Sequence, residues 1–507
     1  HRDLHSFPTR RSSDLSLFIL YYLFFFRVES RTESLVTLNN QFDIFRGITV
    51  PLQFSVDDTS ICFIITTMSI GLATNSLMDY YMKNEINQQR FYNLLNCFLF
   101  SMILLLLSHN IITLLLFWEF IGLFSYFLIN FWNVKPGTFK SATKAMVYNQ
   151  VSDISLISAS VMYFNLKGSL SLPGKFEPLN PLVEGSITYY NFMLFLFFLA
   201  ASCKSAIFPM HYWLPDSMDA PAPASALIHS ATLVASGVFL ITKLQPIIIQ
   251  GSFVTKIFSF LSLFTILVGG LAAASHNDLK KILAYSTVSN CGFMVYFGIN
   301  APVDLSTYFF MAHGFLKAAS FLTVSMLIII MGHKQDHRYS TGVSFYRPFF
   351  IPSLVISFGG LGALPLSIIQ QIKHEVLLNS SMSSTFNNIE DLFINLGILT
   401  SVIYSLKVIN SIVCGGYKKK KIKTSGYVVN IEYNSSSFLI SFVMQSVIIL
   451  YFIYYFKILG GYIEYITGCE YMDYTNLTFN RYGYDNLLNS FFKKLQIALV
   501  LIYSISV

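Results

Sequence analysis

Long apolar stretches recur along most of this chain, and each has the length of a membrane crossing. A transmembrane helix needs about 20 consecutive apolar residues. Stretches that qualify lie at 59–79, 92–108, 111–132, 142–164, 188–208, 224–244, 254–274, 281–299, 306–331, 349–369, 391–413 and 437–456, and a further one begins near 494. Short polar connections join them. The sequence therefore predicts an all-α, polytopic bundle of about 12–14 transmembrane helices.

Composition agrees with a membrane protein. Hydrophobic residues make up 54% of the 507-residue chain and charged residues 12%, about half of what a soluble domain carries. The formal net charge is +7, which in a soluble protein would suggest nucleic acid. Here the basic residues are concentrated in short loops, as in the lysine run 418–421, and such loops set membrane orientation. We therefore expect lipids as contacts, this run on the cytoplasm-equivalent (matrix) side, and no nucleic acid.

The six cysteines are scattered and include no CxxC pair. Disulfide frameworks, zinc sites and iron–sulfur ligation all need closer grouping. The sequence thus predicts no metal site and no redox centre within this chain.

The chain divides into three parts by composition. Residues 1–15 are polar and stop abruptly at an apolar run, so we interpret them as an adapter or cloning scar; the alternative is a native basic tail. Residues 16–413 form the predicted transmembrane core. Residues 414–507 combine a basic loop with a divergent transmembrane region that ends within an apolar run, from which we expect a truncated carboxyl end.

Two opposite charges are set deep in apolar segments. A charge at the bilayer centre costs about 2.5–3.5 kcal/mol, so such residues usually serve function. Glu119 lies in IITLLLFWEFIGLFSYFLINFW and Lys204 in FMLFLFFLAASCKSAIF. Because burial and a nearby carboxylate both act on the charge of a lysine, a Glu119–Lys204 pair that forms and breaks would gate a proton. The alternative for Lys204 is that it extends from a helix end to the membrane surface, since Pro209 follows.

A proline-rich segment between His211 and His229 predicts a broken helix. Pro209, Pro215, Pro221 and Pro223 fall within it, and proline blocks helix continuation. Broken helices at membrane depth are tolerated against protein or a water-filled cavity. Histidine titrates near neutral pH, so both histidines are candidates for proton transfer. The alternative is that they are structural core residues.

Further basic residues occur in the next helices. Asp278, Lys280 and Lys281 open one helix, where Lys281 is a relay candidate, Lys280 a weaker one, and interfacial anchoring the alternative for both. His313 and Lys317 stand four residues apart, which places them on one helix face. Two basic groups on one face of an apolar helix indicate a polar path.

A second interrupted segment follows in SFGGLGALPLSIIQQIKHEVL, with Lys373 after the interruption and Glu375 nearby. Interfacial anchoring is the alternative for Lys373. A charged helix followed by a Pro- or Gly-interrupted segment near a lysine thus occurs at 119–223 and again at 313–375. Paired interruptions of this kind indicate inverted repeats with discontinuous helices.

At these residues the chain resembles a known family, the antiporter-like membrane subunits of NADH–ubiquinone oxidoreductase (respiratory complex I), and within it the chain 5 type, which is related to large subunits of Mrp cation/proton antiporters. The segment 204–243, KSAIFPMHYWLPDSMDAPAPASALIHSATLVASGVFLITK, resembles the family signature almost end to end. FWEFIGLFSYFLINFW is similar to its glutamate helix, NDLKKILAYSTVSNCGFM to its NDxKKxxAxSTxSQLG stretch, AHGFLKA to HAFFKA, and GALPLSIIQQIKHE to GxPFxxGFxSKD. The resemblance covers about residues 50–410.

The chain departs from the family pattern at several positions. Gln150 and Ser152 stand where the family has Arg and Gly, although Asp153 is kept, and Asn290 replaces Gln. The family's long lateral helix is not evident in the sequence after residue 413. In the family this helix runs along the membrane arm, so its absence puts the role of the subunit in anchoring the arm in doubt, but not its role in proton transfer.

The resemblance implies a mechanism driven by partners. Lys204 would exchange charge with Glu119, and protons would pass along a central axis and leave near Lys373. It implies a proton-translocating subunit of an NADH:ubiquinone reductase, beside a chain 4-type neighbour and accessory subunits in the mitochondrial inner membrane. NADH, FMN, Fe–S clusters and ubiquinone would be bound by other subunits. The implied proton-transfer residues are Glu119, Lys204, His229, Lys281, His313, Lys317 and Lys373, supported by Asp153, His211 and Asp278.

Two alternatives stay open from the sequence. An Mrp-type antiporter subunit would carry a similar core, although usually with a much longer carboxyl-terminal extension. A structural subunit with relict charges is the other, and the cost of each unused buried charge argues against it.

Overall fold

The computed structural model describes residues 34–413, except 46–47, 83–84, 86, 134, 174–185, 249–252, 332–333, 340–349, 365–366 and 381–386. The chain divides into two compact units, His1–Tyr451 and Phe452–Val507, and all the described residues belong to the first. The proposed scar at 1–15, the lysine run and the predicted spans at 437–456 and beyond 494 lie outside the described residues.

Helices dominate the described part. They are α2 Asp58–Tyr81, α3 Gln88–Leu107, α4 Ile111–Ile129, α5 Pro136–Lys167, α6 Ser186–Lys204, α7 Trp213–Asp216, α8 Ala222–Ser230, α9 Leu233–Ile248, α10 Phe253–Ser275, α11 Leu279–Asn300, α12 Val303–Ile330, α14 Phe350–Leu361, α15 Ile368–Ser380 and α16 Asn387–Val413, with the single 3₁₀ turns η1 Met210–Tyr212, η2 Ser217–Asp219 and η3 His337–Tyr339. Nine segments of the described chain are long and apolar enough to cross a membrane. The prediction of a multi-pass helical membrane protein is confirmed.

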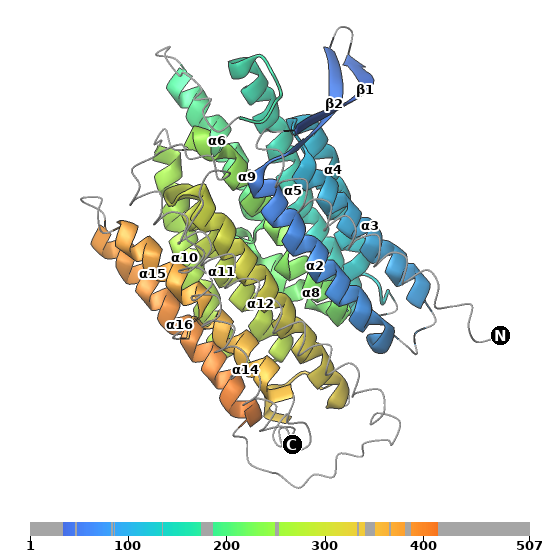
Figure 1. The fold of residues 1–507 in the computed structure, drawn as a ribbon, viewed down its shortest axis with the longest axis vertical. Helices are drawn as coiled ribbons and strands as arrows, with labels where there is room; N and C mark the ends of the chain where they lie inside the picture. The colour runs from blue at the N-terminus through green and yellow to red at the C-terminus, as the bar shows by residue number, and fades with distance from the viewer. Residues whose placement is uncertain are drawn as a thin grey trace, which may run out of the picture. The chain divides into compact units, whose positions relative to one another are not determined.

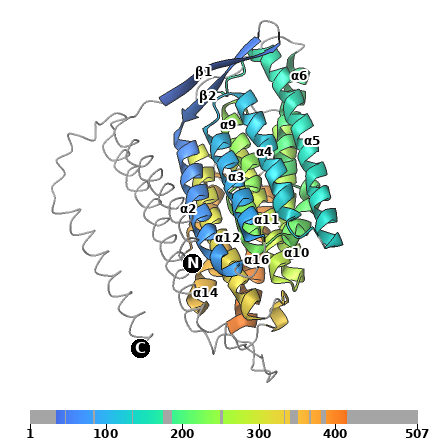
Figure 2. The ribbon, with the colours of Figure 1, turned by 90° about the vertical axis from the view of Figure 1, so that its right-hand side faces the viewer.

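The long helices lie side by side, and burial separates central from peripheral ones (Figures 1 and 2). The continuous apolar segment of α8 and α9 is fully buried, and those of α11 and α12 are 94% buried, whereas α3, α4 and α16 bury less than half. The central helices carry His229, Lys280, His313 and Lys317. These basic residues are therefore held in the middle of the bundle.

A β-hairpin precedes the first described helix and was not predicted. Strands β1 Ser34–Phe45 and β2 Ile48–Val56 pair antiparallel, and the hairpin lies at one end of the bundle beside the start of α2 (Figure 2). In the sequence of β2, ITVPLQFSV, every second residue is a large apolar one, with Thr49, Pro51, Gln53 and Ser55 between them. This is a strand pattern, and it is too short for a membrane helix. Phe54 bridges to Ser108 between α3 and α4, and this contact ties the hairpin to the bundle.

Both predicted helix interruptions are present. After α6 the chain passes through η1, α7 and η2 before α8 begins, and α14 is likewise separated from α15. At each interruption an alanine has left-handed backbone, with φ of 53° at Ala206 and at Ala363. This conformation is uncommon for residues other than glycine and costs on the order of 1–3 kcal/mol. Surrounding contacts must hold it, and Ala206 is fully buried.

Candidate functional site

Lys204 ends α6 in the protein interior and is held by α4. Its side chain is fully buried, and its Nζ donates a hydrogen bond of 2.5 Å to the Trp118 carbonyl. The same ammonium lies 4.5 Å from the centroid of the Trp118 ring, an attraction worth on the order of 2 kcal/mol when desolvated. Lys204 therefore does not extend to the membrane surface.

The tryptophan that holds Lys204 is itself fixed by α5 and α6. Trp118 Nε1 donates to Ser152 Oγ at 3.1 Å, and Ser152 Oγ donates to the Ala200 carbonyl at 2.9 Å. Ser152, one of the departures from the family pattern, thus links three helices around the lysine.

Glu119 does not pair directly with Lys204. No ion pair of Lys204 occurs among the described residues, and Glu119 is exposed on the outer side of α4. Successive helical residues point about 100° apart, so an inward Trp118 turns Glu119 outward. The predicted contact is wrong in this conformation. Asp153 on α5 is the carboxylate that acts most strongly on Lys204, and Glu119 acts more weakly.

Asp153 is a partly buried carboxylate that interacts electrostatically with both of these charges. Its Oδ1 is buried and has no hydrogen-bond partner among the described residues. Its charge acts on Lys204, and Lys204 and Glu119 act on it in turn. The sequence placed Asp153 in a supporting role, and in the structure its charge interacts with both the buried lysine and the outward glutamate.

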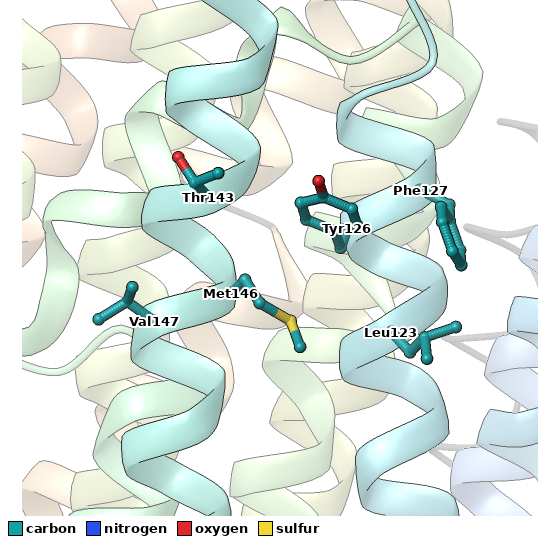
Figure 3. A pocket seen from close by; sticks show the side chains of 6 residues that line it. All are labelled: Leu123, Tyr126, Phe127, Thr143, Met146 and Val147. Carbon is teal, nitrogen blue, oxygen red and sulfur yellow. The ribbon is translucent and has the colours of Figure 1, made fainter. Parts of the chain in front are cut away.

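The outward face of α4 borders an apolar groove. A volume of about 410 Å³ is lined by Leu123, Tyr126 and Phe127 of α4 and by Thr143, Met146 and Val147 of α5, and Tyr126 and Met146 lie in the space between the two helices (Figure 3). Leu123 follows Glu119 by four residues, so the two share one side of the helix. The exposed carboxylate of Glu119 is thus next to apolar surface on the outside of α4, and no buried charged residue lines the groove.

His229 lies at the end of the interrupted segment and is 1% exposed. Its Nε2 is 3.2 Å from Ser217 Oγ, and its ring lies 5.7 Å from that of Phe321 on α12, nearly parallel. Nδ1 is buried without a hydrogen-bond partner among the described residues. His229 therefore has one occupied and one open nitrogen.

His211 has surroundings different from those of His229. Its ring is stacked on that of Phe208 and tilted against that of Tyr212, with ring centroids 5.6 and 4.3 Å away. Tyr212 is exposed, and Lys144 Nζ lies 5.9 Å from its ring while pairing with Asp216 at 2.6 Å. His211 therefore belongs to a cluster at the edge of the interrupted segment.

Of the two adjacent lysines at the start of α11, Lys280 is buried and Lys281 is exposed, although the sequence favoured Lys281 as the relay residue. Lys280 is 4% exposed, and its Nζ donates to the carbonyls of Met218 and Ala220 at 3.3 and 3.2 Å. Lys281 is half exposed and pairs with Asp278 at 3.7 Å. The helix turns Lys280 toward the interrupted segment and Lys281 with Asp278 outward, so the burial expected of a relay residue is found at Lys280, and the relay role of Lys281 stays a prediction.

Lys317 and His313 share the inner face of α12, as the spacing predicted, and both are fully buried. Lys317 Nζ donates to the Leu283 carbonyl and to Ser286 Oγ, both at 2.6 Å on α11. The His313 ring lies beside the backbone of His229. α12 therefore connects α8 with α11.

Lys373 on α15 is also fully buried, which excludes the anchoring alternative. Its Nζ lies 3.9 Å from the Phe293 ring centroid and 5.9 Å from that of Phe309. It has no hydrogen-bond partner among the described residues. Aromatic faces, rather than oxygen atoms, hold this ammonium.

Together these side chains form a row of electrostatic neighbours. His229 is acted on by Lys317 and Lys280, and His313 by Lys317 and Lys373. The row runs from the interrupted segment beside α8 to the second interruption before α15. Lys204, with Asp153 and Glu119, forms a separate group on α4–α6. Sequence reasoning missed Ser217, Ser286 and Trp118, which hold titratable groups of the site, because neutral residues in apolar helices or in a proline-rich segment give no signal.

Comparison with known proteins gives one family. Residues 108–403 match the family described as NADH:quinone oxidoreductase/Mrp antiporter, TM, a range that contains every site residue named above. The NADH-ubiquinone oxidoreductase chain 5 of Paramecium tetraurelia is 39% identical over 330 residues, which cover 64% of this chain and 58% of the relative. The chloroplastic NAD(P)H-quinone oxidoreductase subunit 5 of Dioscorea elephantipes is 31% identical over 360 residues, covering 69% and 47%.

A solved structure has the same fold. A chain of the Mrp complex from Dietzia sp. DQ12-45-1b superposes with a TM-score of 0.68 at 17% identity, covering 98% of this chain and 60% of that one. The chain spans about half to three-fifths of the length of these curated relatives.

Proposed function

Because the chain belongs to the NADH:quinone oxidoreductase/Mrp antiporter transmembrane family, we propose that it translocates protons as a membrane-arm subunit of an NADH:ubiquinone oxidoreductase. The observation that carries the proposal is the row of buried basic groups His229, Lys280, Lys317, His313 and Lys373, which ends at two helix interruptions. Buried charges in membrane helices are costly and mark ion paths. Because these buried groups interact electrostatically, a change in the charge of one group alters how readily its neighbour binds a proton.

Each group has a distinct part in the proposed transfer. Lys204 exchanges charge with Asp153 in the first instance and with Glu119 through it. His229 and His313 take up and release protons, since imidazole does so near neutral pH. Lys317 and Lys373 hold or lose charge as their neighbours change. Lys280 replaces Lys281 in the path proposed from the sequence.

The energy source lies outside the residues of this site. NADH, FMN, Fe–S clusters and ubiquinone belong to other subunits in this proposal, and the expected neighbours are a chain 4-type membrane subunit, accessory subunits and lipids. The proposed location is the mitochondrial inner membrane; the name of the Paramecium relative specifies ubiquinone, whereas the Dioscorea relative is chloroplastic.

The proposal is tested by Lys204→Met in the complex that contains this chain, reconstituted in liposomes. NADH-driven proton uptake and NADH oxidation are measured together, with exposed Lys281→Met as the matched control. We expect Lys204→Met to lower the number of protons moved per NADH, and Lys281→Met to leave it unchanged. An unchanged ratio in Lys204→Met contradicts the assignment.

The alternative is an Mrp-type cation/proton antiporter subunit, favoured by the structural likeness to the Mrp complex. It predicts Na⁺-dependent proton movement that needs no NADH. Adding a Na⁺ gradient to the same liposomes without NADH separates the two functions, and a proton flux in that experiment would favour the antiporter.

A further inference from the structure

The hydrogen bonds of Ser217 determine which nitrogen of His229 carries the proton. Ser217 Oγ is 2.5 Å from the Leu214 carbonyl oxygen and 3.2 Å from His229 Nε2. A carbonyl oxygen can only accept, so the hydroxyl hydrogen must lie between the two oxygens. Were it directed at Nε2, two oxygen lone pairs would face each other at 2.5 Å.

The Ser217 hydroxyl is then left with lone pairs toward the imidazole. A neutral imidazole has one N–H donor and one bare nitrogen, and the partner of one nitrogen sets the state of the other. Because Ser217 faces Nε2 with an acceptor, Nε2 carries the hydrogen and donates it. We propose that Ser217 is a positioning residue that fixes His229 as the Nε2–H tautomer, so that His229 takes up its proton at Nδ1.

Ser217 is held firmly enough to do this. It is fully buried, and its carbonyl accepts the Ala220 N–H within η2. On either side of Asp219, Lys280 donates to the carbonyls of Met218 and Ala220. The turn that carries Ser217 is therefore fixed by α11, independently of His229.

Nδ1 is the nitrogen left open for chemistry. It is buried and has no hydrogen-bond partner among the described residues. The charged or titratable groups that act on the ring are Lys317 of α12 and Lys280 of α11, and His313 of α12 lies beside its backbone. A proton bound at Nδ1 gives an imidazolium that keeps its Nε2–H bond to Ser217.

The same geometry closes the Nε2 side to proton exchange. For a proton to leave through Ser217, the hydroxyl would have to pass its own hydrogen to the Leu214 carbonyl, which is not a proton acceptor of useful strength. Protons therefore enter and leave His229 through Nδ1. This inference rests on the proposed role of His229 in proton transfer, but the tautomer itself is measured without any transport.

The test is magnetic resonance of the full chain, labelled with ¹⁵N,¹³C-histidine and placed in lipid bilayers at alkaline pH. Ring ¹⁵N and ¹³C shifts distinguish the two tautomers, and the signal lost in His229→Gln identifies the residue. We expect Nε2–H in the wild type and in Ser217→Thr, which keeps the hydroxyl. In Ser217→Ala the ratio of Nε2–H to Nδ1–H should fall by about fivefold, the value of one hydrogen bond.

Ser236→Ala is the matched control, because Ser236 is fully buried and its hydroxyl donates within its own helix to the Leu233 carbonyl. It should leave the His229 signal unchanged. An Nδ1–H tautomer in the wild type overturns the proposal even if Ser217→Ala does not fold, and so does an unaltered ratio in a folded Ser217→Ala. If the wild-type complex pumps no protons while the Nε2–H signal is present, the proposed function fails and the tautomer assignment stands.

Discussion

Lys204 of α6 donates its hydrogen bond to the backbone carbonyl of Trp118 on α4, and its ammonium lies over the indole of the same residue. The lysine thus contacts the neighbour of Glu119 in sequence rather than Glu119 itself. A carbonyl and an aromatic face stabilise the cation without accepting its proton. The carboxylates that could do so, Asp153 and Glu119, act on it from farther away.

Replacing Trp118 should therefore affect both stability and transport. Trp118→Leu removes the aromatic face and leaves unfilled volume in a fully buried site, and we expect the free energy of unfolding to fall by an amount that approaches the roughly 3–5 kcal/mol of truncation to alanine. Trp118→Phe keeps a ring over Lys204 and loses the bond to Ser152, so about 1–2 kcal/mol is expected. Thermal unfolding in detergent and protons moved per NADH check both variants; equal effects of Leu and Phe would contradict a role for the ring.

The adjacent lysines of α11 provide a second test. Lys280→Met leaves the carbonyls of Met218 and Ala220 without their charged donor, and we expect proton transfer to slow by at least roughly tenfold, as for the loss of 1.5–3 kcal/mol. Lys281→Met removes an exposed pair with Asp278, which is worth little. Initial rates of NADH-driven pumping measure both, and the reverse order of effects would restore Lys281 as the relay residue.

A third prediction concerns stability alone. Lys407 of α16 donates to the carbonyls of Ala274 and His276 at 2.8 and 2.7 Å, and so caps the carboxyl end of α10. Cations are favoured at that end of a helix. Lys407→Met should lower the free energy of unfolding by about 1–3 kcal/mol, measured by chemical denaturation, without changing the protons moved per NADH.

Exposed Lys256 near the start of α10 supplies the control for this third change. Lys256→Met likewise removes one positive charge, from the opposite end of α10, and should alter stability by less than about 0.5 kcal/mol. Equal destabilisation by the two variants would show that net charge, rather than the cap, matters.

The sequence predicted the apolar helices, both interruptions and the burial of Lys204, His229, His313, Lys317 and Lys373, because each follows from local composition. It could not decide between Lys280 and Lys281. They are neighbours of the same type, and the rotation of α11 against the interrupted segment determines which one is buried. The outward direction of Glu119 could not be predicted for a similar reason. Its helix is apolar on all sides, so the sequence pattern does not show which face is turned toward the protein interior.

Ser217 shows a different limit of sequence reasoning. A serine in a proline-rich segment is unremarkable until its two neighbours are known, because its role depends on one hydroxyl hydrogen and on the carbonyl that accepts it. Asp153 was recognised as a supporting residue through the family resemblance. Its interaction with both Lys204 and Glu119 depends on the packing of α5 against α4 and α6, which the sequence does not reveal.

The left-handed alanines, Ala206 and Ala363, have a consequence for how the chain tolerates change in length. In a continuous helix each inserted residue rotates everything beyond it by about 100°, so one extra residue early in α11 would turn Lys280 out of the core. At Ala206 and Ala363 the helical phase is reset, and the directions of side chains before and after are set independently. Lys204 and His229 can therefore both point inward although they do not belong to one continuous helix. An insertion or deletion on one side of an interruption leaves the side-chain directions on the other side unchanged.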